Sequence, residues 1–322
     1  MDKITILTNQ INVPFDERIT FKTILKKILF LNTIRKIISM RKSCYGGHYA
    51  VTRSLVEGLK KIHAEFNYNP SKIDKVGKVV VVLSNIEALR QAIKWKKEGR
   101  IKKLLAGPNL AMLPSEIKDL EYYQLIDAYL HPSQFIIDWW SSLDPNFGIK
   151  QVIWFAGVNQ NEWFTDQQTK YNILIYEKKC QSTLINYIKD YLTVNHYQYS
   201  IIKYGEYTKE QYKIALANSK LVIYLSPSES QGIALFEAWA ANVPTLVWNR
   251  KYFKWNNYTG PGTSAPYLSE LTGQAFQNQK EFISQFNSII SNLNLFKPAQ
   301  WIKSNGTDEI CAQNLIHLIK TI

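Results

Sequence analysis

Cysteine is scarce in this sequence, and its scarcity excludes two kinds of stabilising chemistry. The chain of 322 residues contains three cysteines, Cys44, Cys180 and Cys311, and no Cys-x-x-Cys pair. An odd number of widely separated cysteines favours neither a disulfide framework nor a structural zinc site. We therefore expect a protein of a reducing compartment, the cytoplasm.

Long apolar runs are also missing. No run approaches the roughly 20 residues that a transmembrane helix needs. The first residues, MDKITILTN, are typical of a strand and not of a signal peptide, because no basic stretch followed by an apolar core is present. Apolar residues nevertheless make up 46% of the chain, enough for a sizeable core. The composition predicts a globular protein without a membrane span.

Several catalytic signatures are absent as well. The sequence contains no HExxH, no GxSxG, no GxxxxGK[ST] and no GxGxxG. These absences argue against a zinc protease, an α/β-hydrolase, a P-loop NTPase and a standard dinucleotide-binding enzyme. We expect no metal and no cofactor.

Acidic residues are outnumbered, since the formal net charge is +13. Most of the excess lies in the first half, and an insertion at residues 20–42 is both apolar and basic. Such a segment can lie on an anionic membrane, or it can pack against the body of the protein with its lysines outward. Lys27 and Arg35 interrupt its apolar side, and both readings stay open. Nucleic acid is not expected, because no recognition motif accompanies the charge.

The chain alternates between strand and helix signals, which is the α/β pattern of parallel sheets. We expect strands at residues 3–8, 79–83, 103–106, 128–130, 152–155, 172–176, 199–204, 221–225 and 244–248. Helices are expected at residues 50–64, 86–98, 182–192, 209–217, 233–241, 280–293 and 307–320. This order predicts two Rossmann-like domains that face each other across a cleft, at residues 1–156 and 157–322. The last helix can pack back on the first domain.

The residues between 221 and 248 carry the clearest chemistry. Glu229 falls in the loop SPSESQG after a strand, and Glu237 lies eight residues later in the following helix. A helix start with small residues and a glycine is suited to a diphosphate, because free amides and the positive end of the helix dipole meet there. Carboxylates next to a diphosphate are explained if they accept hydrogen bonds from sugar or ribose hydroxyls. The spacing alone is equally compatible with two ordinary surface charges.

The wider segment resembles the C-terminal domain of GT-B glycosyltransferases of family 4. The matching residues occur in the family's order: Gly205, Ser226, Glu229, Gly232, Glu237, Ala238 and Pro244. The resemblance implies that Glu229 is the catalytic glutamate, which contacts the transferred sugar, and that Glu237 holds the ribose. It implies a diphosphate cradle formed by Ser230, Gln231, Gly232, Ile233 and Ala234.

The resemblance also implies a basic clamp for the diphosphate, normally an arginine and a lysine. The arginine is absent here, and Lys178 or Lys179 is the available lysine, with Arg250 and Lys251 as substitutes. In the first half, Gly46 and Gly47 resemble the family's Gly-Gly loop over the donor phosphates. His48, Asn109 and His131 are the polar residues expected near the acceptor or in the cleft, and none of them is assigned as a catalytic histidine.

The implied function is transfer of a sugar from a nucleotide diphosphate, such as a UDP- or GDP-sugar, to an acceptor hydroxyl. The family implies retention of the anomeric configuration without a metal ion, in keeping with the absence of Asp-x-Asp. A glycan, a lipid-linked molecule or a protein can be the acceptor, and an anionic membrane surface is a further candidate partner. We expect a monomer or a weak oligomer. The alternatives are a sugar-nucleotide 2-epimerase and a GT-B scaffold that has lost catalysis.

Overall fold

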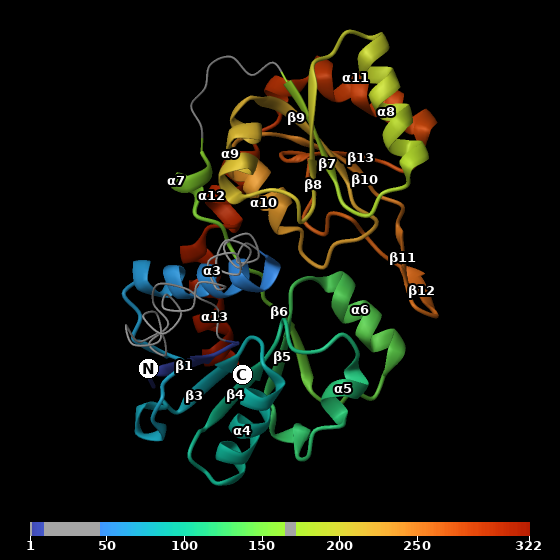
Figure 1. Ribbon diagram of the computed structural model, residues 1–322. Coiled ribbons are helices and arrows are strands. Elements are labelled where there is room, and N and C mark those ends of the chain that lie inside the picture. Colours follow the sequence, from blue (N-terminus) through green and yellow to red (C-terminus); the bar gives the residue numbers. More distant parts are fainter. Residues whose placement is uncertain (1, 10–45, 165–171) are drawn as a thin grey trace, which may run out of the picture. The chain divides into compact units, whose positions relative to one another are not determined.

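The computed structural model describes residues 2–9, 46–164 and 172–322. The basic insertion at residues 20–42 lies outside the described residues. The chain divides into two compact units, the first formed by Met1–Gly157 with Asp308–Ile322 and the second by Val158–Thr307 (Figure 1). Among the helices that the structure describes, none is long and apolar enough to cross a membrane.

The first unit is built on a six-stranded parallel sheet of order β2-β1-β3-β4-β5-β6. Its strands are β1 (Ile4–Leu7), β2 (Phe66–Tyr68), β3 (Val79–Val82), β4 (Lys103–Ala106), β5 (Ala128–His131) and β6 (Lys150–Ile153). All four valines of β3 are buried, because a parallel strand in the middle of a sheet is covered on both faces. Its helices are α3 (Gly47–Lys61), α4 (Ile86–Lys97), α5 (Pro114–Lys118), α6 (Gln134–Leu143) and α13 (Asp308–Thr321).

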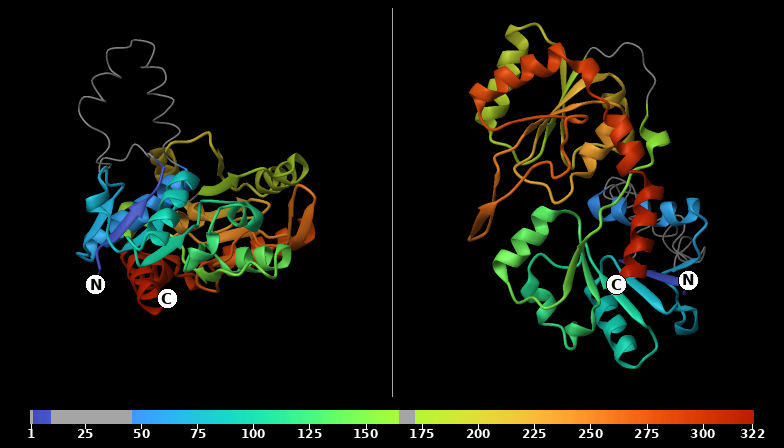
Figure 2. Two further views of the ribbon diagram at one scale, coloured as in Figure 1. Left: turned by 90° about the horizontal axis from the view of Figure 1, so that it is seen from below. Right: turned by 180° about the vertical axis from the view of Figure 1, so that it is seen from behind.

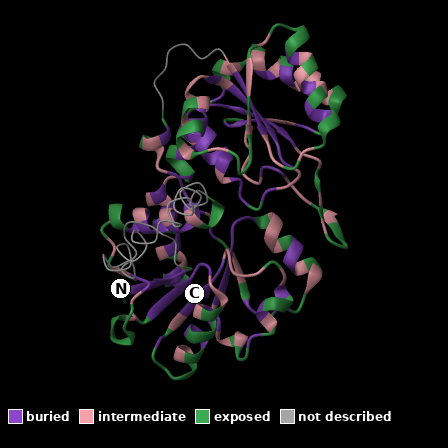
Figure 3. Ribbon diagram, viewed as in Figure 1, coloured by how far each residue is buried: buried purple, intermediate pink, exposed green. Residues whose placement is uncertain are grey.

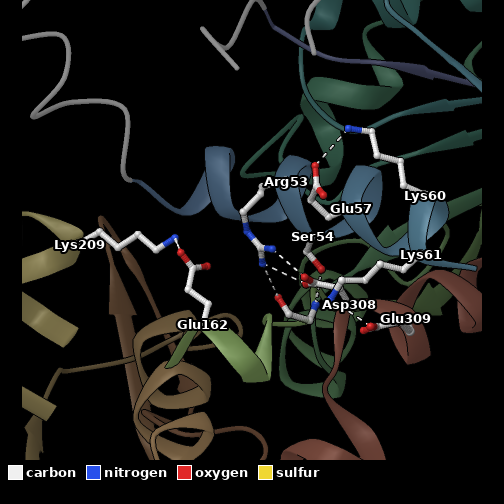
Figure 4. Close-up of polar contacts among 10 residues, drawn as sticks. Arg53, Ser54, Glu57, Lys60, Lys61, Glu162, Lys209, Asp308 and Glu309 are labelled. Carbon is white, nitrogen blue, oxygen red and sulfur yellow. Dashed lines mark hydrogen bonds and ion pairs between the residues drawn. The ribbon is translucent and has the colours of Figure 1, made fainter. Parts of the chain in front are cut away.

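Helix α13, the last of the chain, packs against α3 within the first unit (Figure 2). Gly58 of α3 permits the close approach, since a Cβ there would lie 2.1 Å from the backbone oxygen of Asp308. Arg53 holds the buried carboxylate of Asp308 and also donates to the backbone oxygen of Gly157. Figure 4 shows this ion pair and a neighbouring one between Lys61 and Glu309. The final helix is therefore fixed by packing and by charge.

The second unit is built on a five-stranded parallel sheet of order β13-β10-β9-β7-β8. Its strands are β7 (Asn172–Glu177), β8 (Tyr199–Lys203), β9 (Ser219–Leu225), β10 (Thr245–Trp248) and β13 (Gly273–Phe276), with an antiparallel hairpin of β11 (Tyr252–Trp255) and β12 (Tyr258–Pro261). Its helices are α7 (Gln160–Trp163), α8 (Ser182–Val194), α9 (Lys209–Ala217), α10 (Ile233–Ala240), α11 (Gln279–Ser291) and α12 (Pro298–Asn305). Figure 3 shows the central strands β7, β9 and β10 as mostly buried.

Alternate residues of the central strands pack on opposite faces of the sheet. Ile173, Ile175 and Ile223 pack with α8 and α11 in one apolar cluster. Successive side chains of a strand point to opposite faces, so Tyr176 and Tyr224 lie on the other face, where Tyr176 contacts Tyr212 of α9. The predicted class, α/β with two Rossmann-like parallel sheets, is confirmed.

Candidate functional site

The candidate site lies where β7 and β9 end side by side. Glu177 pairs with Leu225 at the last position of both strands. The backbone N–H of Lys178 then donates to the carbonyl of Leu225 at 2.8 Å. The first residue after β7 is therefore held next to the start of the Ser226–Gly232 loop, although the two are far apart in sequence.

Glu229 is the centre of the site. Its side chain is about nine-tenths buried, and the Nζ of Lys178 lies 2.9 Å from each of its carboxylate oxygens. The hydroxyl of Tyr224 donates to Oε1 at 2.8 Å. A charge this buried requires such partners, because an unpaired carboxylate away from water is costly. The lysine and the tyrosine together explain how Glu229 is stable in a buried position.

The backbone of the Glu229 loop is held from a second direction. The N–H of Glu229 donates to the carbonyl of Thr263 at 2.9 Å, and the hydroxyl of Ser264 donates to the carbonyl of Ser226 at 2.7 Å. Asn249, which follows β10, donates from Nδ2 to the hydroxyl of Thr263 at 3.2 Å. The segment after the β11–β12 hairpin thus fixes the position of the carboxylate.

Gly232 caps the N-terminus of helix α10 and has a φ of +86° in the left-handed region. That conformation favours glycine and turns the chain sharply from the loop into the helix. The positive end of the helix dipole lies here, together with the backbone N–H groups of the first turn. Gln231 and Glu237 are buried, and Ser230 is exposed. The helix start thus brings amide donors, Glu229 and Lys178 to the same end of the sheet.

A group of tyrosines lies near both glutamates. Tyr224 stacks on Tyr176 with ring centroids 4.7 Å apart, and the hydroxyl of Tyr176 lies 3.1 Å from that of Tyr207. Burial and the charge of Glu237 raise the pKa of Tyr207, while burial and the charge of Glu229 raise that of Tyr224. The phenols are therefore neutral donors at any physiological pH. These neutral tyrosines, joined by one ring stack and one hydrogen bond, connect the surroundings of the two carboxylates.

The other basic residues named from the sequence lie differently. Lys179 is exposed and has a left-handed φ of 53°. The guanidinium of Arg250 lies 4.3 Å from the ring centroid of Tyr252 and 5.2 Å from that of Trp248. Lys251 is exposed beside it at the base of the hairpin. Of the four candidates, Lys178 is the one that the described structure pairs with Glu229.

The candidate residues of the first unit lie at the ends of its elements. Gly46 caps the N-terminus of α3, and Gly47 and His48 form its first turn, where all three are exposed. Asn109 follows β4 and is half-buried, and its N–H donates to the carbonyl of Leu83. His131 ends β5 and is buried against the rings of Tyr129 and Trp140. Burial lowers its pKa to about 4.

Sequence reasoning missed Tyr224 and Thr263, both of which hold Glu229. A signal for Tyr224 was available, since the strands NILIY and LVIYL both carry a tyrosine near their ends, and these two residues pair in register. The sequence contained no signal for Thr263, because it binds Glu229 through its backbone carbonyl, which any residue could supply. Among the described residues, no group of three or more His, Cys, Asp or Glu side chains is arranged to hold a metal ion.

Two Rossmann-like parallel-sheet units of this kind define the GT-B fold, and comparison with solved structures shows it. The chain is similar to the apo form of the lipopolysaccharide outer core galactosyltransferase WaaB over 86% of this chain and 96% of the other, with a TM-score of 0.57 and 11% identity. It is also similar to a glycosyltransferase from Rickettsia africae ESF-5, over 99% and 97% of the two chains, at a TM-score of 0.51 and 13% identity. TarM matches 74% of this chain with 54% of its own, at a TM-score of 0.52 and 11% identity. No protein-family model matches the chain, and no curated protein matches it.

Proposed function

We propose that this protein is a glycosyltransferase that moves a sugar from a nucleotide diphosphate to an acceptor hydroxyl. The observation that carries the proposal is the meeting of Lys178, Glu229 and the start of α10 at one end of the second sheet. Ligands of open α/β sheets bind at the carboxyl ends of the strands. Two neighbours with the same fold are named as a galactosyltransferase and a glycosyltransferase, which supports the same class of reaction here.

The roles follow from the chemistry of the donor. Its diphosphate needs positive charge and N–H donors, which Lys178 and the amides of Ser230, Gln231, Gly232, Ile233 and Ala234 would supply. Its sugar presents hydroxyls, and we assign Glu229 to accept hydrogen bonds from them. The ribose presents a diol, which we assign to Glu237. UDP- and GDP-sugars are the candidate donors.

The transfer itself would need little acid–base chemistry from the protein. In a retaining, metal-independent scheme, the leaving phosphate takes the acceptor proton on the face where the bond breaks, and the enzyme positions both reactants and stabilises the developing charge. Lys178 is suited to stabilise that charge because it already lies at the end of the sheet beside the helix start. We assign Gly46 and Gly47 to the phosphates of the donor. His48, Asn109 and His131 are assigned to the acceptor side, with His131 as a buried support.

The acceptor belongs to the same proposal. A glycan or a lipid-linked hydroxyl near an anionic surface agrees with the excess of basic residues in the first half of the chain. A cytoplasmic location, with peripheral contact to a membrane, would follow from such an acceptor. Nothing in this assignment needs a cofactor.

Incubation with a panel of UDP- and GDP-sugars, with and without acceptors, tests the proposal. A glycosyltransferase releases nucleoside diphosphate faster when its acceptor is present, and a glycosylated product appears. Glu229→Gln and Glu237→Gln should lose that activity, whereas Glu210→Gln, on an exposed glutamate of α9, should keep it. Epimerisation without acceptor would point instead to a 2-epimerase, and binding without turnover of any donor would point to a scaffold. Either result would refute the transfer.

A further inference from the structure

The two side chains that bind Glu229 differ in their freedom to leave it. Lys178 lies in the loop after β7, its side chain is 23% exposed, and its Nζ also lies 4.6 Å from the ring centroid of Tyr204. A lysine on four rotatable bonds can be redirected by a stronger anion. A diphosphate carries more negative charge than one carboxylate, and it would therefore compete for this ammonium group.

Tyr224 cannot leave in the same way. It is fully buried in the central strand β9, and its ring is stacked on Tyr176 with an angle of 7° between the planes. Moving the hydroxyl away from Glu229 would require the core of the second unit to open. Burial raises the pKa of Tyr224, so its hydroxyl keeps the proton that it donates.

The consequence concerns the state in which donor is bound. If Lys178 turns to the diphosphate, the carboxylate of Glu229 stays buried without the ammonium group that balanced its charge. The carboxylate would then rotate or attract the lysine back, unless another donor held one oxygen. The Tyr224 hydroxyl on Oε1 does so without neutralising the charge, and it leaves Oε2 to accept from a sugar hydroxyl.

We propose that Tyr224 is the positioning residue of Glu229, which holds the carboxylate in place for the sugar while Lys178 is exchanged from Glu229 to the diphosphate. This inference rests on the proposed function, because it requires a donor with both a diphosphate and a sugar. It adds a residue that lies outside the segment from Glu229 to Glu237, and it gives the two partners of Glu229 separate functions. Tyr224 serves recognition of the sugar, and Lys178 serves recognition of the diphosphate.

The test compares Tyr224→Phe, which removes the hydroxyl and keeps the ring, with Tyr191→Phe. Tyr191 lies on α8 of the same unit, where its hydroxyl donates to Asn287 at 2.9 Å, away from the strand ends. The ligands are the nucleotide sugar of a UDP- and GDP-hexose panel that most stabilises the wild type, and the matching nucleoside diphosphate without sugar. Calorimetric titration gives the Kd of each.

Positioning of Glu229 predicts a selective loss. Tyr224→Phe should weaken binding of the nucleotide sugar, and lower kcat/KM, by roughly 10- to 100-fold, the range expected for a hydrogen bond to a charged group. Its affinity for the nucleoside diphosphate should stay within about twofold of wild type. An equal loss for both ligands, or no loss for either, overturns the proposal. Tyr191→Phe should match the wild type with both ligands.

A double variant tests whether the effect of Tyr224→Phe is exerted through Glu229. If Tyr224 acts through Glu229, adding Tyr224→Phe to Glu229→Gln should cost little more than Glu229→Gln alone, and additive losses contradict the proposal. Should Tyr224→Phe fail to fold, Tyr224→Phe/Glu229→Gln should fold, since no buried carboxylate remains beside the lost hydroxyl. Equal instability of the two variants contradicts the proposal. A wild type that binds neither ligand refutes the proposed function, whereas a wild type that binds both with an indifferent Tyr224→Phe refutes this inference alone.

Discussion

Arg53 and Asp308 join the first long helix of the described chain to its last helix through two parallel contacts. Nη1 lies 2.7 Å from Oδ2 and Nη2 lies 3.0 Å from Oδ1, and the Asp308 side chain is fully buried (Figure 4). Asp308 is also the first residue of α13, where a negative charge interacts favourably with the helix dipole. The buried pair is therefore expected to affect the stability of the first unit more than an exposed ion pair would.

Removing the arginine should strongly destabilise the first unit. Arg53→Met leaves a buried carboxylate without its guanidinium, and we expect a loss of about 3–5 kcal/mol in the free energy of unfolding. Urea titration followed by circular dichroism measures it. The matched control is Lys60→Met on the same helix, whose exposed pair with Glu57 should contribute less than about 1 kcal/mol. Equal effects of the two substitutions would contradict this account.

Stability should fall in mild acid because of His131. Its folded pKa of about 4 lies below the ordinary 6.5, so the unfolded chain binds the proton more readily. The contribution of the neutral ring to the free energy of unfolding is complete above pH 6.5. It is lost as the pH falls toward 4, and the loss is about 3 kcal/mol at most. His131→Gln removes this titration, so its stability should decline less than that of the wild type between about pH 7 and pH 4.5. His317→Gln, on an exposed histidine, should follow the wild type.

Gly232→Ala should damage both stability and ligand binding. Its φ of +86° is unfavourable for alanine, and the new Cβ would lie 2.9 Å from Leu235 Cδ1, so we expect a loss of about 1–2 kcal/mol. The methyl group would also stand at the helix start that is proposed to receive the diphosphate. Gly148→Ala, with a φ of +81° in the first unit, should show a similar loss of stability. If the two variants bind nucleotide sugars equally well, the helix start is not the phosphate site.

Lys178 and Lys179 provide a comparison between adjacent residues. Lys178→Met should weaken binding of a nucleoside diphosphate by roughly 10- to 100-fold, because one charge-assisted contact is lost. Lys179→Met should change it by less than about threefold, since that side chain is exposed and the pair with Glu229 is made by Lys178. Calorimetric titration with UDP and GDP measures both. If Lys179→Met had the larger effect, Lys179 and not Lys178 would be the residue that binds the diphosphate.

The sequence predicted the central strands because uninterrupted apolar runs have one explanation in an α/β protein. NILIY, LVIYL and TLVW lie in β7, β9 and β10. The edge strands β2 and β13 were missed, since FNY and GQAF are short and only partly buried. The hairpin of β11 and β12 was not predicted either, because its aromatic and polar residues do not form an apolar run.

The candidate site was predictable only where sequence neighbours form it. Glu229, Gly232 and Glu237 share one loop and helix, and the spacing of motif residues was enough to select them. The contact between Lys178 and Glu229 joins the loops that follow β7 and β9, so a choice between Lys178 and Lys179 needed the register of these two strands. Tyr224 was missed because a tyrosine in a buried strand resembles a core residue, and the matching tyrosines of NILIY and LVIYL gave no indication that its hydroxyl reaches a charge five positions later.

Calorimetric titration of the wild type, Glu229→Gln, Glu237→Gln and Glu210→Gln with a panel of UDP- and GDP-sugars tests the central claim most directly. We predict that at least one nucleotide sugar binds the wild type and Glu210→Gln with a Kd below about 1 mM, the upper end of usual substrate affinities. Both Glu229→Gln and Glu237→Gln should bind it at least about tenfold more weakly. A wild type that binds no nucleotide sugar, or substitutions at both glutamates that leave the Kd unchanged, would contradict the claim.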